Sequence, residues 1–105
     1  MSTKIEYTLW DKEGEPLFTI DGNKYIAQKG EQVDFYDIII NYWIEYSGMV
    51  DSIQYSPYKD LVSINCIINY DLTQWDLERI QTYNRIKNES TQNVQVHPTN
   101  GAPPR

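Results

Sequence analysis

Residues 61–70 hold the pattern that most constrains the fold, because apolar and polar side chains alternate there with the period of a half-buried β-strand. One face would carry Val62, Ile64, Cys66, Ile68 and Tyr70, and the other Ser63, Asn65 and Asn69. Residues 4–10 alternate in the same way, and residues 17–20 resume a strand after a polar turn that contains Gly14 and Pro16. Short strands separated by turn residues predict a mainly β domain.

Two further segments are predicted to reverse the chain. Asp21-Gly22 is a strong hairpin signal, because glycine accepts a positive φ angle, and residues 24–27 would then form the return strand. Residues 55–60 form a turn around Pro57, which has the fixed φ angle that many turns require. Both turns indicate that neighbouring strands pair as hairpins.

Residues 33–46 fit two secondary structures. In a helix, the polar residues Asp34, Asp37, Asn41 and Glu45 would form one stripe, and Gly48 would cap the C-terminal end. In a strand, the even-numbered residues from Tyr36 to Tyr46 would form one apolar face, and Ser47-Gly48 would be a hairpin turn into residues 49–54. The β-branched and aromatic composition favours the strand.

A helix is predicted for residues 73–87. Thr73 is a favoured N-cap residue, and Asp76 three positions later resembles the acidic partner of a capping box. Trp75, Ile80, Tyr83 and Ile86 supply apolar positions. From Glu89 the sequence turns to Ser, Thr, Gln, Asn and Pro, which predicts a globular domain over residues 1–88 and a disordered tail over 89–105.

We therefore expect a mainly β fold, built as a curled antiparallel sheet or a small SH3-like barrel of five to six strands with one C-terminal α-helix. The alternative is an α+β fold with a second helix at 34–46. Tyr7, Tyr70 and Trp75 are expected in the core. No run of residues identifies a known family.

Charge narrows the choice of partners. The net charge is −6, and residues 30–58 contain five acidic residues and no Lys or Arg. Direct binding to nucleic acid is disfavoured, because phosphate contacts need basic residues, and a basic protein partner is favoured. No apolar run approaches the roughly 20 residues of a membrane span, and the N-terminus lacks the apolar core of a signal peptide. We expect a cytoplasmic protein, or one in a host cytoplasm if it is encoded by a phage.

The sequence contains few parts that an enzyme would need. Its one cysteine, Cys66, is expected to be a small buried apolar residue rather than a nucleophile, because the one histidine, His97, lies in the predicted tail. No phosphate-binding loop, dinucleotide fingerprint or EF-hand spacing is present. We expect no catalytic residue, no metal and no cofactor.

The leading functional hypothesis is a non-catalytic protein-binding module, such as a small acidic inhibitor or adaptor of phage or bacterial origin that acts on a basic partner. The alternative is a structural or self-associating subunit, and a small-ligand-binding barrel or an enzyme ranks lower. If residues 33–46 form one strand, Trp43 shares a face with Asp37 and Glu45. The candidate partner-binding residues are Asp37, Trp43, Glu45, Asp51, Tyr55 and Tyr58.

Overall fold

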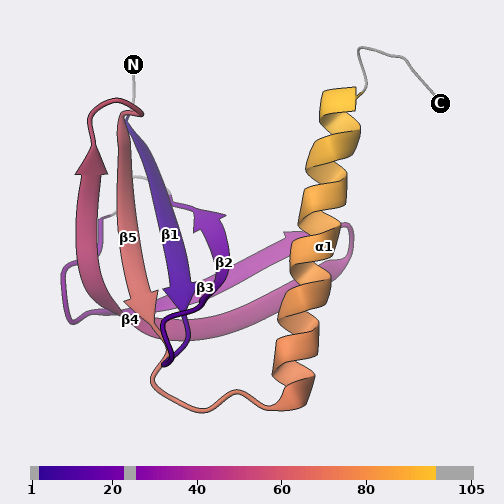
Figure 1. The fold of residues 1–105 in the computed structure, drawn as a ribbon, viewed down its shortest axis with the longest axis horizontal. Helices are drawn as coiled ribbons and strands as arrows, with labels where there is room; N and C mark the ends of the chain where they lie inside the picture. Colours follow the sequence, from indigo (N-terminus) through magenta and orange to yellow (C-terminus); the bar gives the residue numbers. More distant parts are fainter. Residues whose placement is uncertain (1–2, 23–25, 97–105) are drawn as a thin grey trace.

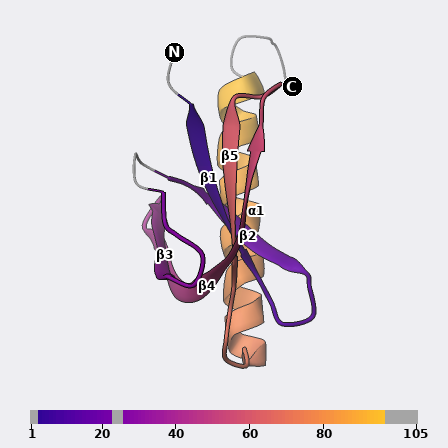
Figure 2. The ribbon, with the colours of Figure 1, turned by 90° about the vertical axis from the view of Figure 1, so that its left-hand side faces the viewer.

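One curled β-sheet and one α-helix make up the fold in this computed structural model, which describes residues 3–22 and 26–96. The elements in chain order are β1 (Lys4–Trp10), β2 (Pro16–Asp21), β3 (Gln32–Ile39), β4 (Tyr42–Ser56), β5 (Leu61–Ile67) and α1 (Gln74–Val96). The five strands are ordered β2-β1-β5-β4-β3 (Figures 1 and 2). The sheet is nearly closed, like a barrel, so the prediction of a mainly β barrel-like fold with one C-terminal helix is confirmed.

The sheet is mixed rather than wholly antiparallel. β1 and β5 are parallel, with a register that runs from Lys4 opposite Leu61 to Trp10 opposite Ile67. The other three pairs, β1–β2, β3–β4 and β4–β5, are antiparallel. The direction of β5 follows from its hairpin with β4, and an alternating pattern carries no information about which other strand it pairs with.

Residues 33–46 are β structure, as the composition favoured, but they form two strands instead of one. Ile40 and Asn41 have φ angles of 48° and 67°, and Ile39 pairs with Tyr42 across this turn. Two consecutive residues with positive φ match a type I′ hairpin turn. A β-branched residue rarely adopts positive φ, so Ile40 gave no turn signal. The alternative with a helix at 34–46 is therefore wrong.

Gly48 lies inside β4 and not in a turn. A Cβ atom at this position would stand 2.5 Å from Cδ1 of Leu9 and 3.1 Å from the carbonyl oxygen of Ile67. The predicted turn at Ser47-Gly48 is wrong, because the glycine serves a close approach of Leu9 to the strand and not a chain reversal. β4 consequently runs on to Ser56, with a register shift at Asp51.

Gly22 has a similar role beside β1. Its N–H donates to the carbonyl oxygen of Ile5 at 2.7 Å, and a Cβ atom there would lie 2.7 Å from Cε1 of Tyr7. The chain thus continues alongside β1 instead of reversing. Of the predicted return strand, residues 24 and 25 lie outside the described residues, and residues 26 and 27 are irregular.

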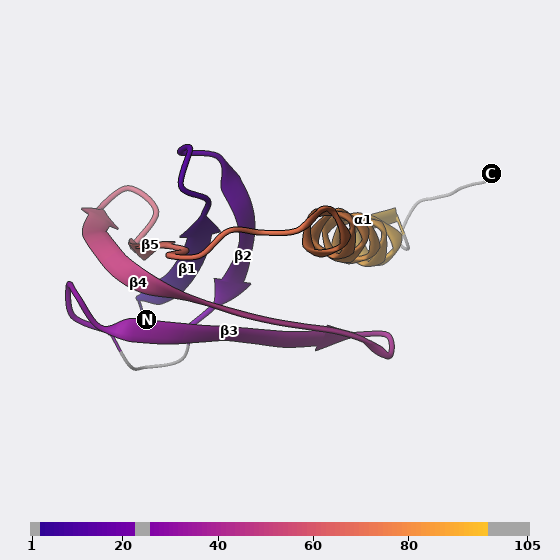
Figure 3. The same cartoon turned by 90° about the horizontal axis from the view of Figure 1, so that it is seen from below.

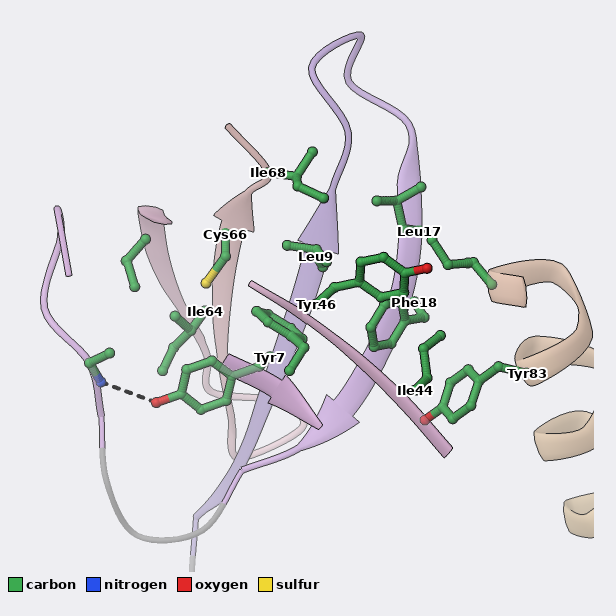
Figure 4. Packing of buried hydrophobic residues seen from close by; sticks show 14 of the residues in the cluster. Tyr7, Leu9, Leu17, Phe18, Ile44, Tyr46, Ile64, Cys66, Ile68 and Tyr83 are labelled. Atoms are coloured by element: carbon green, nitrogen blue, oxygen red, sulfur yellow. Dashed lines mark hydrogen bonds between the residues drawn. The ribbon is translucent and has the colours of Figure 1, made fainter. Parts of the chain in front are cut away.

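The core lies inside the curl of the sheet (Figure 4). Phe18 of β2 makes edge contacts with the rings of Phe35 and Tyr83, at centroid distances of 5.7 and 5.3 Å, and so joins two strands to α1. Tyr7 is buried as predicted, and its hydroxyl accepts a hydrogen bond from the N–H of Ala27. The largest fully buried side chains are Tyr83, Phe35, Leu9, Ile44, Ile64, Ile68 and Cys66.

Tyr70 and Trp75 are not in the core. Their exposed fractions are 40% and 63%. Tyr70 follows the end of β5, which stops at Ile67 instead of residue 70, so the inward alternation no longer applies to it. Trp75 belongs to the first turn of α1, where the buried face of the helix, formed by Ile80 and Tyr83, has not yet begun.

α1 lies beside the open part of the sheet, near β2 and the β3–β4 hairpin (Figures 1 and 3). Asn84 donates to the carbonyl oxygen of Leu17 at 2.8 Å, and Lys87 donates to that of Thr19, so both cover backbone acceptors of edge strand β2. Arg79 donates to the carbonyl oxygen of Trp43 in β4. The helix thereby supplies hydrogen-bond donors to edge strand β2 and to the part of β4, residues 42–48, that pairs with β3 alone.

α1 ends at Val96, beyond the end predicted near residue 87. The helix therefore covers residues 89–96 of the predicted tail, where Gln is a good helix former and Ser, Thr and Asn are tolerated in a helix. Residues 97–105 lie outside the described residues.

Candidate functional site

The outer face of the β3–β4 hairpin exposes large apolar side chains. Tyr36 and Ile38 of β3 are both 53% exposed, and Trp43 of β4 is 52% exposed. Ile38 lies opposite Trp43 in the register, and the rings of Tyr36 and Trp43 are 6.5 Å apart between centroids. Ile40 in the turn is 73% exposed, so the apolar surface continues to the end of the hairpin.

The first turns of α1 extend this surface through Arg79 and Trp75. The guanidinium carbon of Arg79 lies 5.2 Å from the ring centroid of Trp43 and 5.0 Å from that of Trp75. A cation over two aromatic faces is attracted to both, and here it holds the hairpin and the helix together. We call this surface the hairpin–helix patch, and it consists of Tyr36, Ile38, Ile40, Trp43, Trp75 and Arg79.

A cleft of about 230 Å³ opens between the two halves of the patch and is lined in part by Asp76 and Tyr46. Thr73 and Asp76 form the predicted capping box: the N–H of Thr73 donates to Oδ2 of Asp76, and the N–H of Asp76 donates to Oγ1 of Thr73. The hydroxyl of Tyr46 donates to Oδ1 of Asp76 at 2.8 Å. Both carboxylate oxygens are therefore engaged and fix the start of the helix against β4.

These contacts also change the ionisation of Asp76 and Tyr46. The backbone hydrogen bond from Thr73 lowers the pKa of Asp76, and the hydrogen bond from Tyr46 lowers it further. Burial, together with the hydrogen bond to the Asp76 carboxylate, raises the pKa of Tyr46 above its ordinary value. At neutral pH the pair consists of a carboxylate and a neutral phenol, which is the arrangement that the hydrogen bond needs.

The structure separates Asp37 from Trp43 and Glu45. The turn at residues 40 and 41 places Tyr36 opposite Glu45 and Ile38 opposite Trp43, so Asp37 points to the other face of the hairpin. There its Oδ2 accepts a hydrogen bond from the hydroxyl of Tyr83 in α1 at 2.6 Å. The predicted common face of Asp37, Trp43 and Glu45 is wrong, because it assumed one uninterrupted strand.

The other predicted site residues lie elsewhere. Asp51 is exposed at the register shift of β4. Tyr55 donates to Oδ1 of Asp60 at 3.3 Å, and Tyr58 is fully exposed in the β4–β5 turn. That turn lies at the opposite end of β4 from the β3–β4 turn (Figure 1). Of the six candidates, the structure brings together only Trp43 and Glu45.

Sequence reasoning missed most of the hairpin–helix patch. Tyr36, Ile38 and Ile40 were placed on an apolar face of one strand, and Trp75 was placed in the core. If a turn at Ile40-Asn41 is assumed, the even-numbered residues of β3 and the odd-numbered residues of β4 share one face of the hairpin. Asn41 offered a faint signal, because asparagine tolerates positive φ.

Cys66 belongs to β5, the central strand of the sheet, and is part of the core. It is fully buried, and burial raises the pKa of its thiol to about 11, so it is a neutral thiol at physiological pH. Within residues 3–22 and 26–96, no group of three or more His, Cys, Asp and Glu side chains is arranged to hold a metal ion. In the same part of the chain, no helix has both the length and the apolar content of a membrane span.

Comparisons with protein families, with curated proteins and with solved structures found no match to this chain.

Proposed function

We propose that this chain is a non-catalytic protein-binding module that docks a basic protein partner through the hairpin–helix patch. The observation that carries the proposal is the continuity of the patch, in which Arg79 links the exposed aromatic and isoleucine side chains of the hairpin, through Trp43, to Trp75 of the helix. Contiguous exposed apolar surface on a small protein is typical of interaction sites. Tyr, Trp and Arg are also the residue types that supply most of the binding energy in protein interfaces.

The charge of the partner follows from the charge of this chain. The net charge is −6, and the acidic residues Asp34 and Glu45 are exposed beside the patch. Arg79 is the one basic group of the patch, and its guanidinium already lies against Trp43 and Trp75. A positively charged partner is therefore attracted from a distance, and apolar contact with the patch then sets how long it stays bound.

Trp43 is expected to be the energetic centre of the interface. Its ring lies 6.5 Å from that of Tyr36 and 5.2 Å from the guanidinium carbon of Arg79, and about half of its surface is exposed. Truncation of a central interface aromatic costs about 2 kcal/mol or more, which is about thirtyfold in affinity. We expect Trp43→Ala to weaken partner binding by at least about this factor.

The test has two stages. Immobilised chain captures proteins from the source cells, mass spectrometry identifies them, and each identified partner is then purified and titrated by calorimetry against the wild type, Trp43→Ala and Tyr58→Ala. Tyr58→Ala is the matched control, because Tyr58 is an exposed aromatic residue outside the patch. The proposal expects a basic partner whose affinity falls with Trp43→Ala and not with Tyr58→Ala.

Two results would contradict the proposal. One is a partner that binds Trp43→Ala as tightly as the wild type, which would place the interface elsewhere. The other is concentration-dependent self-association in sedimentation that Trp43→Ala abolishes. In that case the patch would be an interface between copies of this chain, as in the alternative of a self-associating subunit.

A further inference from the structure

The sheet carries a second cleft, of about 470 Å³, on the side that faces away from the core. Trp10, Asn65 and Ser52 line it, next to the buried residues Leu9, Cys66 and Val50 of the same strands. The register shift at Asp51 places Ser52 on the opposite face of β4 from Val50. β5 forms the floor, while β1 and β4 on either side of it form the walls. The volume lies in the range of small-ligand sites.

Trp10 is held in place within this cleft. Its indole N–H donates to Oδ1 of Asn65 at 3.0 Å, and Nδ2 of Asn65 donates in turn to Oγ of Ser52 at 3.2 Å. The chain of bonds crosses from β1 through β5 to β4. Because the polar atom of the indole is already bonded, the surface that Trp10 offers to a ligand is its apolar ring.

The wall formed by β4 supplies polar groups that are not otherwise used. Asp51 occupies the register shift of β4, and a bulge of this kind redirects a side chain. The carboxylate of Asp51 and the amide of Gln54 have no hydrogen-bond partner among the described residues, and both line the cleft.

The other charged groups of the cleft are already engaged. Asp11 accepts hydrogen bonds from the N–H groups of Glu13 and Glu15, and Lys12 forms an ion pair with Asp71 at 3.0 Å. Asp51 is therefore the carboxylate of the cleft that accepts no hydrogen bond from the described residues, whereas Oδ1 of Asp11 is engaged.

We propose that this cleft binds a guanidinium group. A guanidinium is planar and cationic, so it stacks on an aromatic ring and forms two parallel hydrogen bonds to a carboxylate. Trp10 supplies the ring and Asp51 supplies the carboxylate, on two strands that are separated by β5 alone. Neighbouring strands lie about 4.8 Å apart, so the backbones of β1 and β4 stand about 10 Å from each other across β5.

The guanidinium group could belong to an arginine side chain of a protein or to a free small guanidine compound, because both present the same planar cation. The cleft does not include any residue of the hairpin–helix patch, so this inference does not rest on the proposed function. If the cleft does not bind a guanidinium group, the proposed protein-binding function is unaffected, and the reverse also holds, because the two tests change different residues and use different ligands.

The test is a titration of the full chain with small ligands, monitored by two-dimensional NMR. The probes are N-acetyl-arginine amide, its neutral isostere N-acetyl-citrulline amide, N-acetyl-lysine amide and the peptide acetyl-Gly-Arg-Gly-amide. The arginine probes are expected to shift the indole N–H of Trp10 and the amide signals of Asp51 and Gln54. Citrulline and lysine should bind about tenfold more weakly or worse, because each lacks either the charge or the planar fork.

Asp51→Asn removes the charge with little change of shape, and Asp34→Asn is the matched control on the outer face of β3. Asp51→Asn should weaken arginine binding by about tenfold, and Asp34→Asn should not. Tighter binding of the peptide than of the single residue would indicate a protein source, and equal binding would indicate a small molecule. Equal binding of arginine and citrulline, or no shift of the Trp10 signal with arginine, would overturn the proposal.

Discussion

Single residues decide where this chain turns and where it does not. Gly22 and Gly48 belong to dipeptides that are typical of turns. Each instead lies where a neighbouring side chain approaches the backbone too closely for a Cβ atom. Ile40 lacks a turn signal, yet it occupies a hairpin turn with positive φ. Local preference is overruled at these three positions by tertiary packing, which a single sequence does not record.

Gly48→Ala should destabilise the fold. The added methyl group would lie 2.5 Å from Cδ1 of the fully buried Leu9 and 3.1 Å from the backbone oxygen of Ile67. Overpacking of this kind costs about 1–3 kcal/mol in the free energy of unfolding. Urea unfolding followed by circular dichroism measures it, with Ser47→Ala in the same strand as control. Equal midpoints for the two variants would show that Leu9 is not confined.

Elements were predicted well where one pattern covered the whole segment. β1, β2 and the capped start of α1 lie close to their predicted bounds, because alternation and the capping box are local signals. β3 and the first part of β4 were predicted as one strand over residues 33–46, because the turn that separates them has no glycine. The hairpin–helix patch depends on that turn, so most of the candidate site could not be predicted from the sequence.

The capping box of α1 should make stability depend on pH. The pKa of Asp76 is lower in the folded state than in the unfolded state, so its stabilising effect is complete above the unfolded value of about 3.9 and is lost as the pH falls through the folded value. Asp76→Asn should be less stable than the wild type at pH 7, and the gap should narrow below about pH 4. Thermal unfolding at several pH values measures the difference in stability between the two proteins. A difference that does not change with pH would contradict a lowered pKa of Asp76 in the folded state.

At the scale of the whole molecule, side chains complete a barrel that the backbone leaves open. β2 and β3 are the two edge strands, and Phe18 and Phe35 make ring contact between them. Asn84 and Lys87 of α1 then cover carbonyl oxygens of β2. The composition predicted a barrel-like sheet with a helix, but these long-range contacts link residues more than 60 positions apart and have no local pattern.

Cys66 should report on the opening of the entire barrel. Its side chain is fully buried in the central strand β5, and burial raises the pKa of the thiol to about 11. A thiol reagent at neutral pH should therefore label it only when the core opens, so labelling should accelerate with urea and in Gly48→Ala. Labelling of the native protein at the rate of an unfolded control peptide would contradict this prediction.

The parallel pairing of β1 with β5 has a consequence for synthesis on the ribosome. β1 emerges first, but one side of it stays unpaired until residues 61–67 have left the exit tunnel. The nascent β1–β2 hairpin is too small to be stable alone, and β3 and β4 cannot join it without β5. Folding of this domain is therefore expected to begin only after its last strand, β5, has been translated, which leaves the early chain dependent on chaperones.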